Sequence, residues 1–193
     1  MPRSGVEARR RLQGAALELW SARGYDATTA AEIAARAGVT ERTFFRHFPD
    51  KREVLFDGAA AMRTLVADAL ERTPSILPPF QALRAAFGAV EPLLAANLAF
   101  SGTRQRVISE TPALQERELS KSAALTKTLA DGLQNRGVDP DVARLAAMAG
   151  MAAFGHAVAA WMRVPEQSLD AHLALAFDQL SALSAPDVQN GRR

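Results

Sequence analysis

The sequence predicts an all-α protein, in which an N-terminal three-helix domain is joined by a long helix to an α-helical C-terminal domain. Apolar side chains recur at intervals of three and four residues along most of the chain, as on the buried face of a helix, and no segment alternates like a strand. Proline, glycine and capping residues separate these periodic segments. We place the N-terminal domain at 6–66 and the C-terminal domain at 75–185, on either side of the proline-rich stretch 73–79.

The first helix is expected to begin at Ser4, because Ser4 and Glu7 have the spacing of a capping box, and to end near Gly24. Its apolar stripe consists of Leu12, Ala15, Ala16, Leu19 and Trp20. The arginines at 9–11 stand near its start. They could lie along a phosphate strand of a nucleic acid or form a solvated basic tail.

Residues 29–48 have the pattern of two short helices joined by a tight turn. Thr29 and Glu32 form a capping-box pair for the first helix, Gly38 can adopt the left-handed backbone at its end, and Thr40 can cap the second. Phe44 and Phe48 lie one turn apart and are expected to face inward. A short helix with polar side chains on its outer faces suits the major groove of DNA, so this segment is a candidate helix-turn-helix motif.

The candidate DNA contacts lie within and around the second of these helices. We expect Arg42, Thr43 and Arg46 in or beside the major groove, and phosphate contacts from Thr29, Thr40, His47 and Lys51. The full candidate set is Thr29, Thr40, Glu41, Arg42, Thr43, Phe44, Phe45, Arg46, His47 and Lys51. Residues 1–55 hold 10 basic and 7 acidic side chains, a net charge of +3, so positive charge gathers where the motif lies.

A long helix is expected to follow the motif. Pro49 ends the preceding helix, and Asp50 with Glu53 can cap the next one. Apolar residues continue at helical spacing from Leu55, so we expect one helix from Lys51 to Leu70. It would begin at the DNA and end in the C-terminal domain, and a tilt of this rod would move the DNA-contacting helix.

The rest of the chain is predicted to be helical. The expected helices are 80–90, 93–109, 112–136, 140–164 and 169–183. Pro92, Pro112 and Pro140 stand at the starts of three of them, Asp139 can cap the helix that begins at Pro140, and Gly137 follows another. A short polar tail is expected after Pro186.

The helix that begins at Pro140 is rich in small side chains, which allow a second helix to pack closely. Together with the last helix it could form a four-helix interface between two chains about a two-fold axis. A buried hairpin within one chain would give the same pattern. The candidate interface residues are Ala146, Gly150, Ala153, Ala157, Leu173, Phe177 and Leu180.

An apolar ligand pocket is a further hypothesis for the C-terminal domain. Its candidate lining is Met62, Phe87, Phe100, Arg104, Met148, Met151, Phe154 and Trp161, with Met162 beside them and with Ser109 and His156 as further polar anchors. Burial statistics favour the ordinary core for each of these apolar residues taken singly, and a hydrogen-bonded core position for His156. An apolar cavity with few polar groups would suit a small hydrophobic effector.

Composition and motifs argue against several other classes of protein. The 193 residues contain no cysteine, which excludes disulfides and thiolate metal sites. We find no run of about eighteen apolar residues and no apolar signal core, so we expect a soluble cytoplasmic protein without membrane contact. The three histidines lack metal-ligand spacing, nucleotide-binding and nucleophile motifs are absent, and the charges around Arg117 and Lys121 read as a solvated face. We therefore expect no enzyme and no cofactor.

The run from Ala15 to Leu55 resembles the DNA-binding domain of the TetR family of bacterial repressors. The matching elements are Gly24-Tyr25, Thr28-Thr29, Ile33-Ala34, Ala37 to Thr40, Thr43 to Phe45, His47-Phe48, Lys51 and Leu55. Together they fix the spacing over some forty residues, about the first third of the chain. One residue departs from the pattern: the family usually has a tyrosine, whose hydroxyl commonly reaches a phosphate, where this chain has Phe45.

This resemblance implies a homodimer that binds a palindromic double-stranded DNA operator and dimerises through its last two helices. It also implies a C-terminal domain that encloses an effector, whose binding changes the angle of the DNA-binding domains. The most direct expectation is a repressor released by a small hydrophobic effector. A dimeric regulator without an effector, or an activator, would place the same helix in the same groove and stays open.

Overall fold

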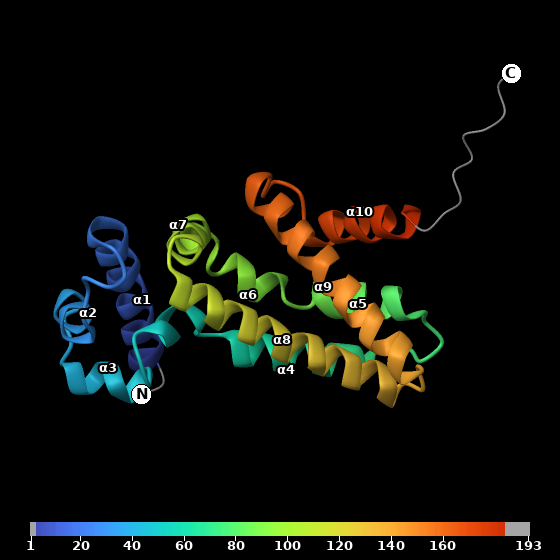
Figure 1. Ribbon diagram of the computed structural model, residues 1–193, viewed down its shortest axis with the longest axis horizontal. Coiled ribbons are helices and arrows are strands. Elements are labelled where there is room, and N and C mark those ends of the chain that lie inside the picture. Colours follow the sequence, from blue (N-terminus) through green and yellow to red (C-terminus); the bar gives the residue numbers. More distant parts are fainter. Residues whose placement is uncertain (1–2, 184–193) are drawn as a thin grey trace, which may run out of the picture. The chain divides into compact units, whose positions relative to one another are not determined.

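The computed structural model describes residues 3–183, and within this range it contains helices and no strand (Figure 1), which confirms the all-α prediction. In chain order the elements are α1 (Arg3–Arg23), α2 (Ala30–Arg36), α3 (Glu41–His47), the 3-10 helix η1 (Arg52–Phe56), α4 (Ala59–Arg72), α5 (Pro79–Gly88), α6 (Glu91–Ala95), α7 (Leu98–Ser109), α8 (Pro112–Asn135), α9 (Pro140–Arg163) and α10 (Leu169–Ala182). The polar tail expected after Pro186 lies outside the described residues.

The chain forms two compact units. Unit 1 contains the chain up to Ala60 and residues 96–123, and unit 2 contains residues 61–95 and the chain from Ala124 onward. These units do not coincide with the expected domains 6–66 and 75–185, because α7 packs against α1 and so belongs to unit 1. Helix α8 contributes its first half to unit 1 and its second half to unit 2.

The core of unit 1 is built from α1, α2, α3, η1, α7 and the first turn of α8. Leu12, Ile33, Phe44, Val54 and Leu114 are fully buried in this one apolar cluster. The expected apolar stripe of the first helix therefore faces the core. Helix α1 begins at Arg3, one residue before the expected start at Ser4.

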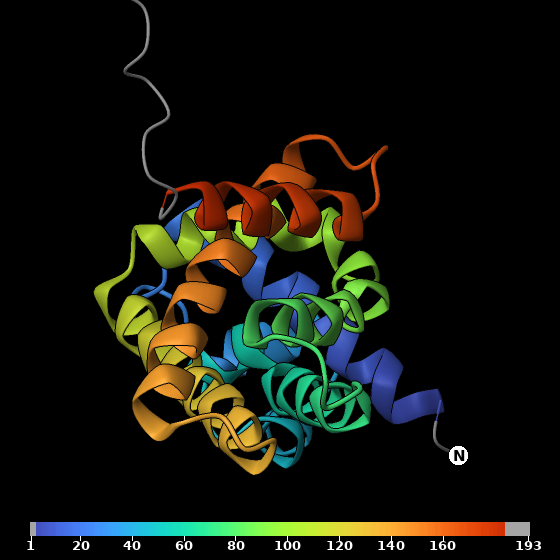
Figure 2. The ribbon, with the colours of Figure 1, turned by 90° about the vertical axis from the view of Figure 1, so that its right-hand side faces the viewer.

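Unit 2 is centred on α5, α9 and α10, which pack against one another (Figures 1 and 2). Phe87 of α5 stacks on Phe154 of α9, with the ring centroids 4.4 Å apart. A Cβ atom added to Gly150 would lie 2.8 Å from Cδ1 of Leu83, so the glycine allows α9 to approach α5 closely. The expected capping position at Asp139 is confirmed, since its side chain accepts hydrogen bonds from the backbone of Asp141 and Val142.

The expected long helix from Lys51 to Leu70 is wrong. Helix η1 ends at Phe56, Gly58 adopts a left-handed backbone with φ of 90°, and α4 begins at Ala59. A left-handed residue cannot continue a right-handed helix, so the segment consists of two helices with a break between them. The expected helix 93–109 is also divided, because α6 ends at Ala95 and α7 begins only at Leu98.

The expectation that no apolar run is long enough to span a membrane is corrected at α9. Over 18 residues this helix has a mean hydropathy of 1.4, which such a span would also show. Core helices of soluble proteins pass the same test, and Ala143, Ala147 and Ala157 of α9 are fully buried in the protein.

Candidate nucleic-acid interface

Helix α2 begins with the capping box expected from the sequence. The Thr29 hydroxyl accepts a hydrogen bond from the backbone N–H of Glu32 at 3.2 Å, and a Glu32 carboxylate oxygen accepts one from the backbone N–H of Thr29 at 2.8 Å. The other oxygen of Glu32 bonds to Arg23 of α1 at 2.9 Å. These contacts fix the start of α2 relative to the end of α1.

The turn after α2 sets the direction of α3. Gly38 has a φ of 69°, and Val39 donates its backbone N–H to the carbonyl of Ala34 at 3.0 Å. Thr40 then caps α3, since its hydroxyl oxygen accepts a hydrogen bond from the backbone N–H of Thr43 at 3.2 Å. The helix-turn-helix arrangement predicted from residues 29–48 is thus confirmed.

The outer face of α3 carries two exposed arginines, Arg42 and Arg46. Glu41, Arg42 and Arg46 are exposed, whereas Thr43 is half-buried and its hydroxyl lies 3.0 Å from that of Thr40. Among the residues that the structure describes, no hydrogen bond or ion pair engages the guanidinium groups of Arg42 and Arg46. Both side chains are therefore available for the base edges or phosphates of a nucleic acid.

The two neighbouring aromatic residues of α3 have opposite surroundings. Phe44 is fully buried in the core of unit 1, so its inclusion among the candidate DNA contacts is wrong and it supports α3 from inside. Phe45 is 51% exposed and meets the Phe44 ring edge-on, with the centroids 5.3 Å apart. Phe45 thus presents an apolar surface where the family usually has a tyrosine hydroxyl.

His47 is partly enclosed at the end of α3. Its Nε2 atom is buried and has no hydrogen-bond partner in the described part of the chain. Burial lowers the pKa of the ring, and the charges of Arg46 and Arg9 lower it further. A phosphate could receive a hydrogen bond from the other ring nitrogen, Nδ1.

Lys51 has a different role from the expected one, because its ammonium group is already occupied. Nζ donates to the backbone carbonyls of Tyr25 at 2.9 Å and Thr28 at 3.0 Å, and it lies 4.0 Å from the centroid of the Tyr25 ring. Lys51 immediately precedes the short helix η1, whereas it was expected to begin a long helix. It therefore holds the loop between α1 and α2, and its expected phosphate contact is corrected.

The three consecutive arginines near the start of α1 are not equivalent. Arg9 forms an ion pair with Asp57 at 2.7 Å and lies over the Phe48 ring, so this residue belongs to the framework of unit 1. Arg10 and Arg11 are exposed. The choice between phosphate contacts and a solvated tail stays open for these two residues alone.

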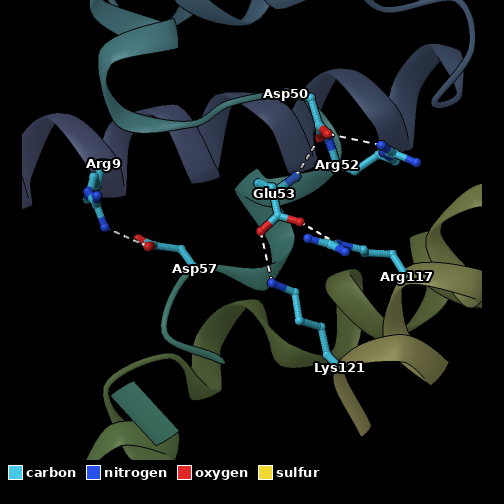
Figure 3. Close-up of polar contacts among 7 residues, drawn as sticks. All are labelled: Arg9, Asp50, Arg52, Glu53, Asp57, Arg117 and Lys121. Atoms are coloured by element: carbon cyan, nitrogen blue, oxygen red, sulfur yellow. Dashed lines mark hydrogen bonds and ion pairs between the residues drawn. The ribbon is translucent and has the colours of Figure 1, made fainter. Parts of the chain in front are cut away.

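Helix η1 is held from several sides by charged residues (Figure 3). Asp50 accepts hydrogen bonds from the backbone N–H groups of Arg52 and Glu53, as its expected capping role requires. The two carboxylate oxygens of Glu53 bind Arg117 and Lys121 of α8. Burial acts to raise the pKa of Glu53, but hydrogen bonds and charges from these two cations outweigh it, so the pKa lies below its ordinary value.

The contacts of Glu53 with α8 could not be expected from the sequence, which predicts a solvated face for Arg117 and Lys121 and only a capping role for Glu53. These cations stand 64 and 68 positions away from Glu53 in the sequence. No local periodicity records such a pairing, so only the fold could show it.

The candidate dimer-interface residues lie mainly in the core of unit 2. Ala146, Gly150, Ala153, Ala157, Leu173 and Phe177 are buried, and Leu180 is half-buried. The six buried side chains face the interior of the same chain, as in the intramolecular hairpin that the sequence left open, so they are wrong as interface residues. Leu180 stays a prediction. The exposed apolar residues of α9 and α10 include Val142, Leu145, Met148 and Leu175.

The candidate pocket residues are divided between the two units. Phe100 and Arg104 belong to unit 1, whereas Met62, Phe87, Met148, Met151, Phe154 and Trp161 belong to unit 2. Arg104 is a framework residue, because its Nε atom donates to the carbonyl of Leu55 at 2.9 Å. Met148 is 58% exposed, so it is not part of an enclosed lining. His156 is exposed too, unlike a core histidine, and Ser109 bonds to its own helix.

A depression of about 390 Å³ lies within unit 1, between the end of α1 and the connection of α7 to α8. Its lining includes Trp20, Tyr25 and Thr111, and none of the candidate pocket residues. The Nε1 atom of Trp20 is buried and has no hydrogen-bond partner among the described residues. This depression is partly polar and open, unlike the apolar cavity expected from the sequence.

Two family models match the chain. The model described as bacterial regulatory proteins of the tetR family matches residues 14–57, which include α2 and α3. The model described as the MftR C-terminal domain matches residues 77–184, more than half of the chain. The two matches together cover both the helix-turn-helix and the helices from α5 to α10.

Two curated proteins are similar to this chain. The HTH-type transcriptional regulator TcmR of Streptomyces glaucescens is 37% identical over 133 residues, which are 65% of this chain but only 59% of TcmR. The proposed mycofactocin biosynthesis transcriptional regulator MftR of Mycobacterium tuberculosis is 26% identical over 191 residues, which are 94% of this chain and 96% of MftR. Both are named as regulators of transcription.

Solved structures share the fold at lower sequence identity. A regulator assigned to the TetR family from Syntrophomonas wolfei has a TM-score of 0.62 at 15% identity, covering 95% of this chain and 98% of that one. The complex of SmeT with triclosan has a TM-score of 0.59 at 22% identity, covering 94% and 93%. The capped helix-turn-helix, the exposed arginines of α3 and the two family matches lead to one conclusion: this chain belongs to the TetR family of bacterial transcriptional regulators and is a DNA-binding protein with a C-terminal domain of the MftR type.

Proposed function

We propose that this regulator is a cytoplasmic homodimer that represses transcription from a palindromic operator and is released by a small hydrophobic effector. The observation that carries the DNA-binding part is the outer face of α3, where Arg42 and Arg46 are exposed and unpaired within the described residues. A capped, protruding helix with such side chains fits the major groove.

The DNA contacts that we propose follow from exposure. Arg42 and Arg46 would read base edges, with the half-buried Thr43 between them. Thr29 and Thr40 stand exposed at the starts of α2 and α3, where the chain would meet the phosphate backbone. Glu41 is exposed beside Thr40, and its carboxylate would accept a hydrogen bond from the amino group of a base. Phe45 would pack against sugar or a thymine methyl group, and His47 would add a hydrogen bond to a phosphate.

The homodimer would use the exposed face of α9 and α10. Val142, Leu145 and Met148 are 51%, 69% and 58% exposed along α9, and Leu175 is 57% exposed on α10. Monomeric proteins rarely leave several large apolar side chains exposed together on neighbouring helices. A two-fold contact here would present two α3 helices to two half-sites of one operator.

Selection of bound sequences from random double-stranded DNA tests this proposal. The purified protein should enrich an inverted repeat, with half-site centres about one DNA turn apart. Arg42→Ala should relax the preference at one position of each half-site, with a cost of about 1–3 kcal/mol there. Enrichment of a single unrepeated site, or of no sequence, would contradict a dimeric repressor.

A regulator that needs no effector is the second candidate function. It is favoured by the stack of Phe87 on Phe154, since these two residues fill space that an apolar pocket would need. The effector proposal is supported by SmeT, a protein of the same fold whose structure holds triclosan. Titration of operator-bound protein with triclosan as the first apolar probe, followed by other apolar compounds, separates the two. Release of DNA supports an effector, and unchanged binding throughout supports the alternative.

A further inference from the structure

Glu53 is the point at which η1 is fastened to α8, and all of these contacts lie within unit 1. Its side chain is only 14% exposed. Oε1 accepts a hydrogen bond from Nε of Arg117, and Oε2 accepts one from Nζ of Lys121 at 3.0 Å (Figure 3). Two cations from successive turns of one helix thus bind one largely buried carboxylate, which is a geometry with little freedom.

A third cation reaches the same short helix from α7. Nε of Arg104 donates to the carbonyl of Leu55 at 2.9 Å, and its guanidinium lies 5.3 Å from the centroid of the Phe56 ring. Arg104 also forms an ion pair with Glu118 of α8 at 3.2 Å. Helix η1, α7 and α8 are therefore joined through both side-chain and backbone contacts.

The segment around η1 is equally tied to the DNA-binding helices. Lys51 binds the carbonyls of Tyr25 and Thr28 in the loop before α2, and Asp57 binds Arg9 of α1. Residues 51–57 therefore lie between the helix-turn-helix on one side and α7 with α8 on the other. An orientation fixed at Glu53 is passed on to α3 through these contacts.

We infer that Glu53 is a positioning residue for operator recognition: it sets the direction in which α3 is presented, although it is not itself placed to read DNA. This inference rests on the proposed dimer on a palindromic operator. A dimer must present two α3 helices to half-sites at a fixed spacing. A wider range of α3 orientations would weaken simultaneous binding of both half-sites, but would leave the contacts of one α3 with one half-site unchanged.

The test compares Glu53→Gln with the wild-type chain on two DNA duplexes. One duplex carries the full palindrome found by selection, and the other carries one half-site with the second half scrambled. The wild type should prefer the full palindrome. Glu53→Gln should bind the half-site within about twofold of wild type and lose at least about tenfold of the preference for the full palindrome.

The matched control is Glu18→Gln. Glu18 forms an ion pair with Arg36 between α1 and α2, but both side chains are more than half exposed. Glu18→Gln therefore removes a glutamate ion pair from the same unit without changing a contact with α8. This variant should bind both duplexes like the wild type. A second arm uses the Arg117→Gln, Lys121→Gln background, in which Glu53→Gln should add no further loss, since the partners are already absent.

Each outcome decides between the alternatives. Equal binding of both duplexes by the wild type would contradict the dimeric repressor and the role of Glu53 together. If the wild type prefers the full palindrome and Glu53→Gln keeps that preference, the inference about Glu53 is overturned and the dimeric repressor stands. An equal loss of affinity for both duplexes would also overturn the inference, because it indicates damage to the fold. If Glu53→Gln does not fold by circular dichroism, Lys121→Gln removes one of the two contacts, and it should lower the full-palindrome preference in the same selective way.

Discussion

Phe45 is an exposed apolar residue of α3, the helix that we propose to contact DNA. It stands half exposed on α3 next to the buried Phe44, and its ring edge has no polar group with which to meet a phosphate. The usual tyrosine of the family differs from it by a single hydroxyl. The fold around this position does not depend on that hydroxyl, because half of the ring lies in solvent.

Phe45→Tyr should therefore tighten operator binding by about 1 kcal/mol, through one hydrogen bond to a phosphate. The slope of log affinity against log salt concentration should stay the same, because a neutral hydroxyl displaces no counterion. Fluorescence anisotropy with labelled operator at several salt concentrations measures both quantities. Equal affinity of the two proteins would mean that the ring at position 45 does not face the DNA backbone.

The ion pairs of Glu53 lead to a prediction of how the free energy of unfolding depends on pH. Its folded-state pKa lies below the ordinary value of 4.5, so its contribution to stability is present above about pH 4.5 and is lost as the pH falls through the folded pKa. Glu53→Gln should be less stable than wild type by about 1 kcal/mol at pH 7. Urea unfolding at pH 7 and below pH 4 should show this difference shrinking. A constant difference would assign the loss to packing.

One prediction at the residue scale failed because of tertiary contacts. Lys51 was expected to face a phosphate because of its type and its position near α3. Its amine instead binds two backbone carbonyls of a distant loop. Sequence patterns report which residues share a helix face, but not which distant carbonyl a flexible side chain will reach.

At the scale of elements, the turn between α2 and α3 depends on the backbone of Gly38. Its φ of 69° lies in the left-handed region, where a side chain is strained by its own backbone. A Cβ atom there would have ordinary contact with Arg11, at 3.8 Å from Nη1, so crowding is not the obstacle. The turn requires the conformation and not the space.

Gly38→Ala should accordingly lower the free energy of unfolding by about 1–2 kcal/mol. Gly14→Ala is the matched control, because Gly14 lies within α1 and a Cβ atom there would have no neighbour within 4 Å. That change should raise stability by about 0.5–1 kcal/mol, since alanine favours the helix. Chemical denaturation of the three proteins gives the comparison. Equal effects of the two substitutions would rule out the backbone explanation.

Helix boundaries were predictable where a local signal marks them. Thr29, Thr40 and Asp139 cap helices as expected, because a capping side chain bonds to the backbone only a few positions away. The breaks at Gly58 and Asn97 were missed, since apolar residues keep their helical spacing on both sides of each break. A rigid helix from Lys51 to Leu70 would have carried a signal as a rod. The divided segment cannot act in that way.

At the scale of the whole molecule, the sequence indicated an α-helical C-terminal region but not which face of α9 is buried. Small residues such as Gly150 proved to face α5 in the same chain, and larger apolar residues were left exposed. Both faces of this helix are apolar, so its periodicity alone could not assign one face to the core and the other to a partner chain.

Leu145→Glu combined with Met148→Glu should convert the dimer into a folded monomer. Both side chains are more than half exposed in the single chain, so the added charges should leave its fold intact. They should destabilise only an interface that buries these positions between two copies. Sedimentation velocity measures the mass, and circular dichroism confirms the fold. Gly150→Glu should instead unfold unit 2, because its Cβ atom would meet Leu83 at 2.8 Å. A double variant that still sediments as a dimer would place the interface elsewhere.

The protein has few lysines, and because their contacts differ, we expect them to differ in their reactivity toward amine-reactive reagents. Its three lysines are Lys51, Lys121 and Lys127. The amine of Lys51 is enclosed by two carbonyls and an aromatic ring, and that of Lys121 is bound to Glu53. Among the described residues, Lys127, whose side chain is 76% exposed, has a single surface ion pair, with Asp131. An acylating dye should therefore modify Lys127 before the other two lysines, and this provides a fluorescent handle in unit 2 without an engineered cysteine.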